Sequence, residues 1–170
     1  MLERAAARIA GGEPLDVRAL ARDTGVGRST LYRWFGDRSA LLGEALWHLT
    51  EHAWCRAGVR ASGAGPEFVV SVFEHFLREI DESRVAATLL TSEPREAFVA
   101  VMSPSGSVQR RAVARTHQLL VQNTDLEGRG ARDVAEVLTQ VTMASVWGLV
   151  VAGGPADVDG AVAVCRRLIV

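Results

Sequence analysis

The fold is decided between residues 17 and 34, where the sequence reads VRALARDTGVGRSTLYRW. Two short helices that cross through a tight turn need a small residue where their backbones touch, a turn residue that tolerates left-handed dihedrals, and apolar residues facing inward. Ala21 meets the first need and Gly25 the second. The inward positions fall on Leu20, Val26, Leu31 and Trp34. This stretch therefore predicts a helix-turn-helix.

The outward side chains of the second helix are of the kinds that contact DNA. In a helix-turn-helix this helix enters the major groove, and Arg28, Ser29 and Thr30 stand at its start. Arginine can bond a guanine edge through two hydrogen bonds, and hydroxyls suit phosphate or base atoms. We expect Asp37 to cap the next helix and Arg38 to open it. A helix N-terminus beside a cation is a favourable seat for a phosphate.

Residues 25–42, which read GVGRSTLYRWFGDRSALL, resemble the DNA-binding segment of the tetracycline-repressor (TetR) family. The similarity covers about residues 1–47, and the turn, the Leu-Tyr-Arg-aromatic-Phe run and the next helix start match in register. It implies phosphate contact for Tyr32 and Arg38. It implies base or backbone contact for Arg28, Ser29, Thr30, Arg33 and Trp34, to which we add the outward Arg18.

The segment departs from the family pattern at two positions. Gly27 stands where the family usually has serine, which weakens a helix cap and removes a hydroxyl from the interface. Asp16 stands where a threonine often touches phosphate, so its carboxylate either repels DNA or caps its helix. The chain also begins inside the family's first helix, without the usual preceding basic arm, so we expect a modest operator affinity, or a native chain that begins earlier.

Composition narrows the class of protein further. The chain has 170 residues, 48% of them hydrophobic, which is enough for a globular core. Its net charge of -1 excludes a basic nucleic-acid coat, although residues 1–47 carry +1 and residues 48–170 carry -2. We find no apolar run that could span a bilayer and no secretory pattern, so we expect a cytoplasmic protein without a membrane partner. Cys55 and Cys165 indicate neither a disulfide framework nor a metal motif.

Apolar residues recur at spacings of three and four between the glycine and proline breaks, which predicts an all-α fold. The predicted helices cover residues 1–10, 16–23, 27–34, 37–60, 66–81, 83–91, 94–102, 106–123, 130–152 and 156–169. We place a boundary near residue 47. Residues 1–47 then form a three-helix DNA-binding domain and residues 48–170 a helical ligand-binding and dimerisation domain.

The second domain is expected to hold the dimer interface that the resemblance implies. Helix 130–152 becomes almost wholly apolar after residue 142, and a helix that is apolar all round is buried on all sides. The same helix of a second subunit is the expected cover, giving a homodimer that presents two recognition helices to half-sites about 34–36 Å apart. The interface candidates are Ala144, Trp147, Gly148, Val151, Ala161, Val162, Cys165 and Leu168.

The resemblance also implies a pocket for a small-molecule effector whose identity is unknown. Pockets of this kind have apolar walls with one or two polar groups. The candidate lining residues are Phe73, Phe76, Leu90, Phe98, Met102, His117, Val121, Met143 and Trp147, for each of which plain core packing is the alternative. Residues 89–92 and 107–111 are similar to TetR regulators of quorum-signal degradation.

These observations favour a transcription regulator that needs no cofactor or metal. We expect a repressor that is released from a palindromic DNA operator by its effector. One alternative is a helical small-molecule-binding protein without operator activity. A remote alternative is a zinc-dependent hydrolase, because residues 48–52 match the H-x-x-E-H signature. In that case His48 and His52 would bind zinc and Glu51 would activate water. A peptidase with this signature needs a third zinc ligand and a much larger chain, which speaks against the hydrolase.

Overall fold

A computed structural model describes residues 1–83, 85, 94–103, 106–148 and 154–170 of the chain. Within these residues all regular elements are helical, which confirms the all-α prediction. The elements are α1 (Leu2–Ala10), α2 (Val17–Thr24), α3 (Arg28–Phe35), α4 (Arg38–Arg60), α5 (Pro66–Glu82), α7 (Pro94–Met102), α8 (Ser107–Asn123), α9 (Gly128–Met143), the π-helix η1 (Ala144–Gly148) and α11 (Val158–Ile169).

Most predicted helices lie within two residues of the observed bounds. The helix predicted over 130–152 differs, because its α-helical part ends at Met143 and gives way to η1. The helix predicted over 83–91 falls outside the described residues except at positions 83 and 85. Within the described residues, no helix is long and apolar enough to cross a membrane.

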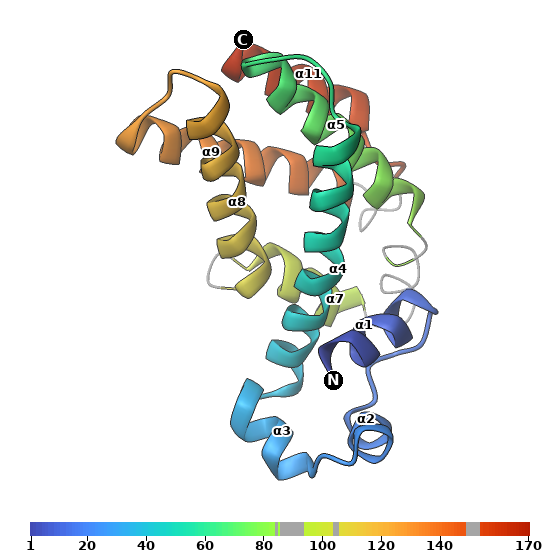
Figure 1. The fold of residues 1–170 in the computed structure, drawn as a ribbon. Coiled ribbons are helices and arrows are strands. Elements are labelled where there is room, and N and C mark those ends of the chain that lie inside the picture. The colour runs from blue at the N-terminus through green and yellow to red at the C-terminus, as the bar shows by residue number, and fades with distance from the viewer. Residues whose placement is uncertain (84, 86–93, 104–105, 149–153) are drawn as a thin grey trace.

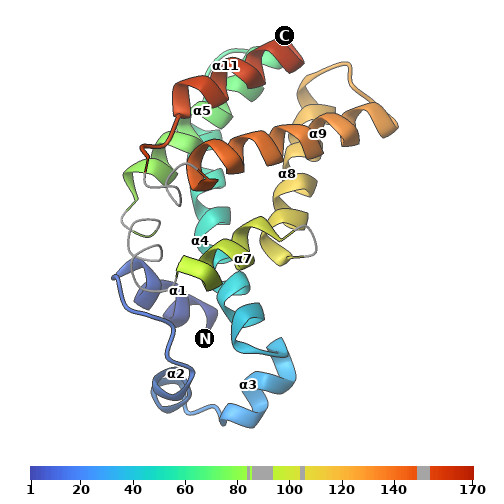
Figure 2. The ribbon, with the colours of Figure 1, turned by 180° about the vertical axis from the view of Figure 1, so that it is seen from behind.

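The long helix α4 connects the two ends of the molecule. Figure 1 shows α2 and α3 at one end, α11 at the other, and α4 running from α3 into the helical body. Helix α4 packs against α1, α5, α7 and α8, and α9 packs against α8 and α11. Figure 2 shows from behind how α9 crosses the body between α8 and α11. Helix α4 therefore connects the helical body directly to the helix-turn-helix.

The hydrophobic core is continuous between the DNA-binding helices and the body. One cluster of buried side chains joins Leu20 and Leu31 of the helix-turn-helix to Leu42 of α4, Val101 of α7 and Val108 of α8. A second cluster lies in the upper body around Trp54, Phe73, Leu120, Leu138 and Cys165. Because the expected boundary near residue 47 falls inside the uninterrupted helix α4, the division into domains 1–47 and 48–170 stays a prediction.

Candidate DNA-binding site and effector cavity

The turn between α2 and α3 has the geometry that the sequence predicts. Gly25 ends α2 in the left-handed region with φ +67°, where glycine avoids the steric cost that a side chain meets. Leu20 and Leu31 are fully buried and Val26 is half-buried. Trp34 is the exception, because its side chain is 55% exposed, so the expectation that it faces inward is wrong. Leu31 is the only fully buried residue of α3, Thr30 and Phe35 are half-buried, and the other residues of this short helix are exposed.

The predicted contact residues of α3 form one exposed surface. Arg28, Ser29, Tyr32, Arg33 and Trp34 are all exposed. Thr30 is half-buried, and Arg18 of α2 is exposed. Gly27 precedes the helix and supplies no side-chain cap, as its substitution for serine predicts. The surface therefore offers guanidinium, hydroxyl and aromatic groups together, which are the groups used for phosphate and base contacts.

Two aspartates fix the starts of the flanking helices. The Asp16 carboxylate accepts hydrogen bonds from the N–H groups of Arg18 and Ala19, at 2.8 Å and 3.2 Å. The bond from Ala19, followed by the bond from Arg18, is the main reason that the pKa of Asp16 lies below its usual value. Asp37 accepts from the Ala40 N–H at 2.8 Å and caps α4, as expected. Of the two readings of Asp16, the structure shows the helix cap.

Arg38 is held against the start of α2. Its Nε donates a hydrogen bond to the Leu15 carbonyl oxygen at 3.1 Å, and its side chain is partly buried. Arg38 therefore joins the first turn of α4 to the segment that leads into the helix-turn-helix. A phosphate contact by Arg38, expected from the sequence, would use the same guanidinium group.

A cavity of about 250 Å³ lies in the body beside α4. Its walls come from α4, α5, α7, α8, α9 and η1, with Ala10 of α1 at one edge. Most lining side chains are apolar: Leu46, Leu49, Ala53, Phe76, Leu77, Ile80, Val85, Val101, Val108, Met143, Val146 and Trp147. The π-helix η1 contributes Val146 and Trp147, and short π-helical segments occur frequently at functional sites.

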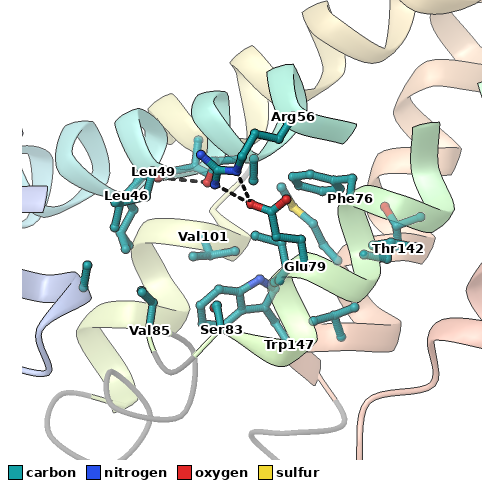
Figure 3. A pocket seen from close by; sticks show the side chains of 18 residues that line it. Leu46, Leu49, Arg56, Phe76, Glu79, Ser83, Val85, Val101, Thr142 and Trp147 are labelled. Atoms are coloured by element: carbon teal, nitrogen blue, oxygen red, sulfur yellow. Dashed lines mark hydrogen bonds and ion pairs between the residues drawn. The ribbon is translucent and has the colours of Figure 1, made fainter. Parts of the chain in front are cut away.

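The polar groups of this cavity are few and mostly paired. Figure 3 shows Arg56 of α4 reaching Glu79 of α5, and the Arg56 Nε lies 2.7 Å from Glu79 Oε1. Thr50 and Thr142 also line the cavity, and their hydroxyls donate to helix carbonyls one turn earlier, those of Leu46 and Leu138. The cavity can therefore surround an apolar molecule and meet one polar group at the Arg56–Glu79 pair.

The residues predicted to line a pocket are distributed over several places. Phe76, Met143 and Trp147 line the cavity. Phe73 is buried in the upper core, and Met102 packs against the lower core cluster. Phe98 and Val121 are 39% and 45% exposed, and His117 is half-buried, so none of these three belongs to the lining. Leu90 lies outside the described residues.

The residues that sequence reasoning missed are mainly those of α4. Leu46, Leu49, Thr50, Ala53 and Arg56 follow one another at spacings of three and four along its cavity-facing side. The same periodicity predicts only that this side is covered, not that space remains next to it. Arg56 carries the one local signal, because a charged residue continues an otherwise uncharged stripe.

The predicted interface residues also separate into two groups. Ala144 and Leu168 are exposed, and Gly148 and Val162 are half-buried. By contrast, Ala161 and Cys165 are completely covered by their own chain, which leaves them no surface for a partner. Trp147 faces the cavity, and Val151 lies outside the described residues. Exposed Val137 of α9 is a further apolar side chain on this part of the surface.

The H-x-x-E-H segment lies on α4 without the surroundings of a zinc site. The His48 and His52 rings meet edge to face, with centroids 4.7 Å apart. Glu51 and His52 are exposed. Among the described residues, no group of three His, Cys, Asp or Glu side chains is placed to hold a metal ion. The described structure therefore supplies no third ligand for this pair.

Together these features define a class: an all-α protein in which a helix-turn-helix is joined through one long helix to a body with an internal cavity. Residues 64–170 match the family described as tetracyclin repressor-like, C-terminal domain. No curated protein matches the chain. Among solved structures, the transcriptional repressor QsdR of the TetR family from R. erythropolis is similar, with 29% identity and a TM-score of 0.89. The alignment covers 99% of this chain and 91% of that one.

The chain therefore belongs to the TetR family and is a DNA-binding transcription regulator rather than an enzyme. The similarity to QsdR also confirms the resemblance to regulators of quorum-signal degradation that residues 89–92 and 107–111 indicate.

Proposed function

We propose that the protein is a homodimeric repressor that leaves a palindromic DNA operator when a small molecule enters the cavity beside α4. The similar protein QsdR is described as a transcriptional repressor. The proposal rests on residues that belong both to the lining of the cavity and to the core of the helix-turn-helix. Leu46, Val101 and Val108 line the cavity and also belong to the core cluster that holds Leu20 and Leu31 of the helix-turn-helix.

DNA recognition is assigned to the exposed surface of α3. Arg28 stands in the first turn of α3, where a side chain in the major groove can pair with a guanine edge. Tyr32, Arg33, Ser29 and Thr30 contact phosphates and neighbouring base atoms, and Trp34 packs along the backbone. Each base pair that Arg28 reads contributes about 1–3 kcal/mol of discrimination. Arg18 and Arg38 reach phosphates at the edges of the surface.

The effector acts on α4 from the side. A molecule in the cavity presses on Leu46 of α4 directly and on Val101 and Val108, which carry α7 and α8. Packed helices respond by small rigid shifts, and a tilt of α4 changes the separation of the two recognition helices in a dimer. By linkage, the effector weakens DNA binding by the same factor by which DNA weakens effector binding.

The cavity walls define the effector's chemistry. A volume of about 250 Å³ suits a small molecule, and the walls require an apolar body. The Arg56–Glu79 pair offers both a donor and an acceptor at one point, which fits a single polar group on the effector. We therefore expect an apolar compound with one polar end.

The dimer forms through α9 and α11 in this proposal. Val137 of α9, Ala144 at the start of η1 and Leu168 of α11 are exposed, and apolar side chains on adjacent helices favour a helix-bundle interface. Sedimentation in dilute buffer is expected to give twice the mass of the chain. Val137→Arg with Leu168→Arg is expected to give monomers, and a wild-type monomer at micromolar concentration contradicts the dimer.

A cavity-filling variant tests the effector response. Operator duplexes obtained by in vitro selection are bound to the protein and challenged with a library of apolar compounds that carry one polar group. We expect some compounds to release the DNA from the wild type but not from Thr50→Leu, which fills the cavity. Ala114→Leu places the same side chain on the exposed surface of α8 and serves as the matched control.

Three results count against the proposal. Release that is equal in the wild type and in Thr50→Leu places the effector elsewhere. Loss of DNA binding in both Thr50→Leu and Ala114→Leu shows that added bulk, rather than the filled cavity, is responsible. Binding of the compounds without any effect on DNA favours the helical binding protein that has no operator activity.

A further inference from the structure

A second cavity lies on α4, α5 and α8 and shares no lining residue with the effector cavity. It is a hollow of about 210 Å³ that is partly open to solvent. Its apolar wall contains Trp54, Phe68, Val72 and Leu119. An apolar cavity of about 150 Å³ is enough to bind benzene, so this one has room for a single aromatic ring with a substituent.

The charge on this second cavity is positive. Arg115 is one of its lining residues, and none of the others is a carboxylate. The guanidinium faces neutral groups, with Nη1 at 3.4 Å from Gln118 Oε1 and Nη2 at 3.9 Å from Cys55 Sγ. Within the described residues, no ion pair to Arg115 is formed. An arginine with neutral neighbours beside an apolar wall is suited to a carboxylate, which it can bind through two parallel hydrogen bonds.

The same wall contains a buried donor without an acceptor. Trp54 Nε1 is inaccessible to solvent and has no hydrogen-bond partner among the described residues. The Trp54 ring stacks on Phe76 at a centroid distance of 4.4 Å, and Phe76 lines the effector cavity. Trp54 therefore separates the two cavities. Buried N–H groups are nearly always paired, so the Trp54 N–H is an exception within the described residues.

We propose that this second cavity binds a small aromatic carboxylate. The ring lies against the wall formed by Trp54 and Phe68, and the carboxylate pairs with Arg115. The site differs in chemistry from the effector cavity, where Glu79 forms ion pairs with both Arg56 and Arg60, whereas Arg115 has no carboxylate partner among the described residues. The occupant of the second cavity therefore supplies the negative charge that Arg115 lacks, whereas the effector meets an arginine that already has a carboxylate partner.

Fluorine NMR titration of the full chain with para-fluorobenzoate tests the proposal. We expect Arg115→Gln to weaken binding about tenfold or more, because a hydrogen bond to a charged group is lost. The neutral para-fluorobenzamide has the same shape. It is expected to bind about tenfold more weakly than the carboxylate and to be insensitive to Arg115→Gln.

The variant Gly58→Leu tests whether the ligand binds in this cavity rather than elsewhere. Gly58 lines the cavity, and a Cβ atom built there meets no atom within 4 Å, so a larger side chain at this position has room to begin and extends into the cavity. We expect Gly58→Leu to abolish binding, and a thermal melt checks that the variant keeps the fold. Val59→Leu, at the neighbouring residue that is 86% exposed, is expected to bind like the wild type.

Thr50→Leu, which fills the effector cavity, is expected to keep its affinity for para-fluorobenzoate. Loss of binding in Thr50→Leu, or binding that survives Gly58→Leu, assigns the ligand to the effector cavity and overturns the proposal. Absence of wild-type binding at millimolar ligand also overturns it. None of these results bears on DNA binding, so the proposed repressor function is tested separately.

Discussion

Arg111 of α8 holds that helix against α4 just beyond the helix-turn-helix. Its Nη1 lies 3.0 Å from Glu44 Oε2, and its guanidinium lies 5.8 Å from the centre of the Trp47 ring. A partly exposed ion pair contributes about 0.2–1 kcal/mol, and a cation–π contact at an exposed site about 0.5–1 kcal/mol. We therefore expect Arg111→Gln to lower the free energy of unfolding by about 1–2 kcal/mol. Glu44→Gln removes the ion pair alone and is expected to cost less.

Urea denaturation followed by circular dichroism measures these changes at a fixed protein concentration, because the stability of a dimer depends on it. The double mutant Glu44→Gln/Arg111→Gln is expected to be more stable than the sum of the two losses implies, by about 0.5 kcal/mol at low salt. Arg110→Gln changes the exposed neighbour on α8 and is expected to stay within about 0.5 kcal/mol of the wild type. Equal losses in Arg111→Gln and Arg110→Gln refute the reasoning, and so does a double mutant whose loss is additive.

Three further predictions concern single side chains. Tyr32→Phe removes one phosphate hydrogen bond and is expected to weaken selected and random duplexes equally, by about two- to tenfold in fluorescence anisotropy; a change in sequence preference contradicts this role. With the native fold intact, a chromogenic thiol reagent is expected to label one cysteine per chain, because Cys55 is exposed whereas burial raises the pKa of the Cys165 thiol to about 12; labelling of both is the contrary result. The lowered pKa of Asp16 means that its cap stabilises the fold above the ordinary carboxyl pKa and loses this effect as the pH falls through the lowered value. Asp16→Asn is therefore expected to reduce the melting temperature at pH 7 more than at pH 2, and an equal reduction at both contradicts the assignment.

The sequence predicts the fold well where local chemistry decides the structure. Asp16 and Asp37 bind the first N–H groups of α2 and α4, and Gly25 adopts the left-handed conformation that ends α2. These signals act within a few residues, so they can be recognised without knowledge of the tertiary packing. The outward positions of α3 follow from the same local geometry.

The cavity could not be predicted in the same way, because its position depends on how distant helices meet. Apolar spacing predicts that a helix has a packed side, but it does not reveal where the side chains leave space. Phe98 shows the limit, since its aromatic ring satisfies the pattern of a lining residue and is nevertheless exposed on α7. Trp34 shows a second limit, because its apolar character suggests burial whereas its side chain is 55% exposed on α3.

Selection of bound sequences from random duplex DNA, run in parallel with the wild type and with Arg28→Ala, tests the central claim most directly. We expect the wild type to enrich a palindrome whose half-sites lie about 34–36 Å apart. Arg28→Ala is expected to enrich the same palindrome with the preference relaxed at one position of each half-site. No enrichment by the wild type, or identical preferences for both proteins, contradicts the assignment of α3 as the helix that reads the operator.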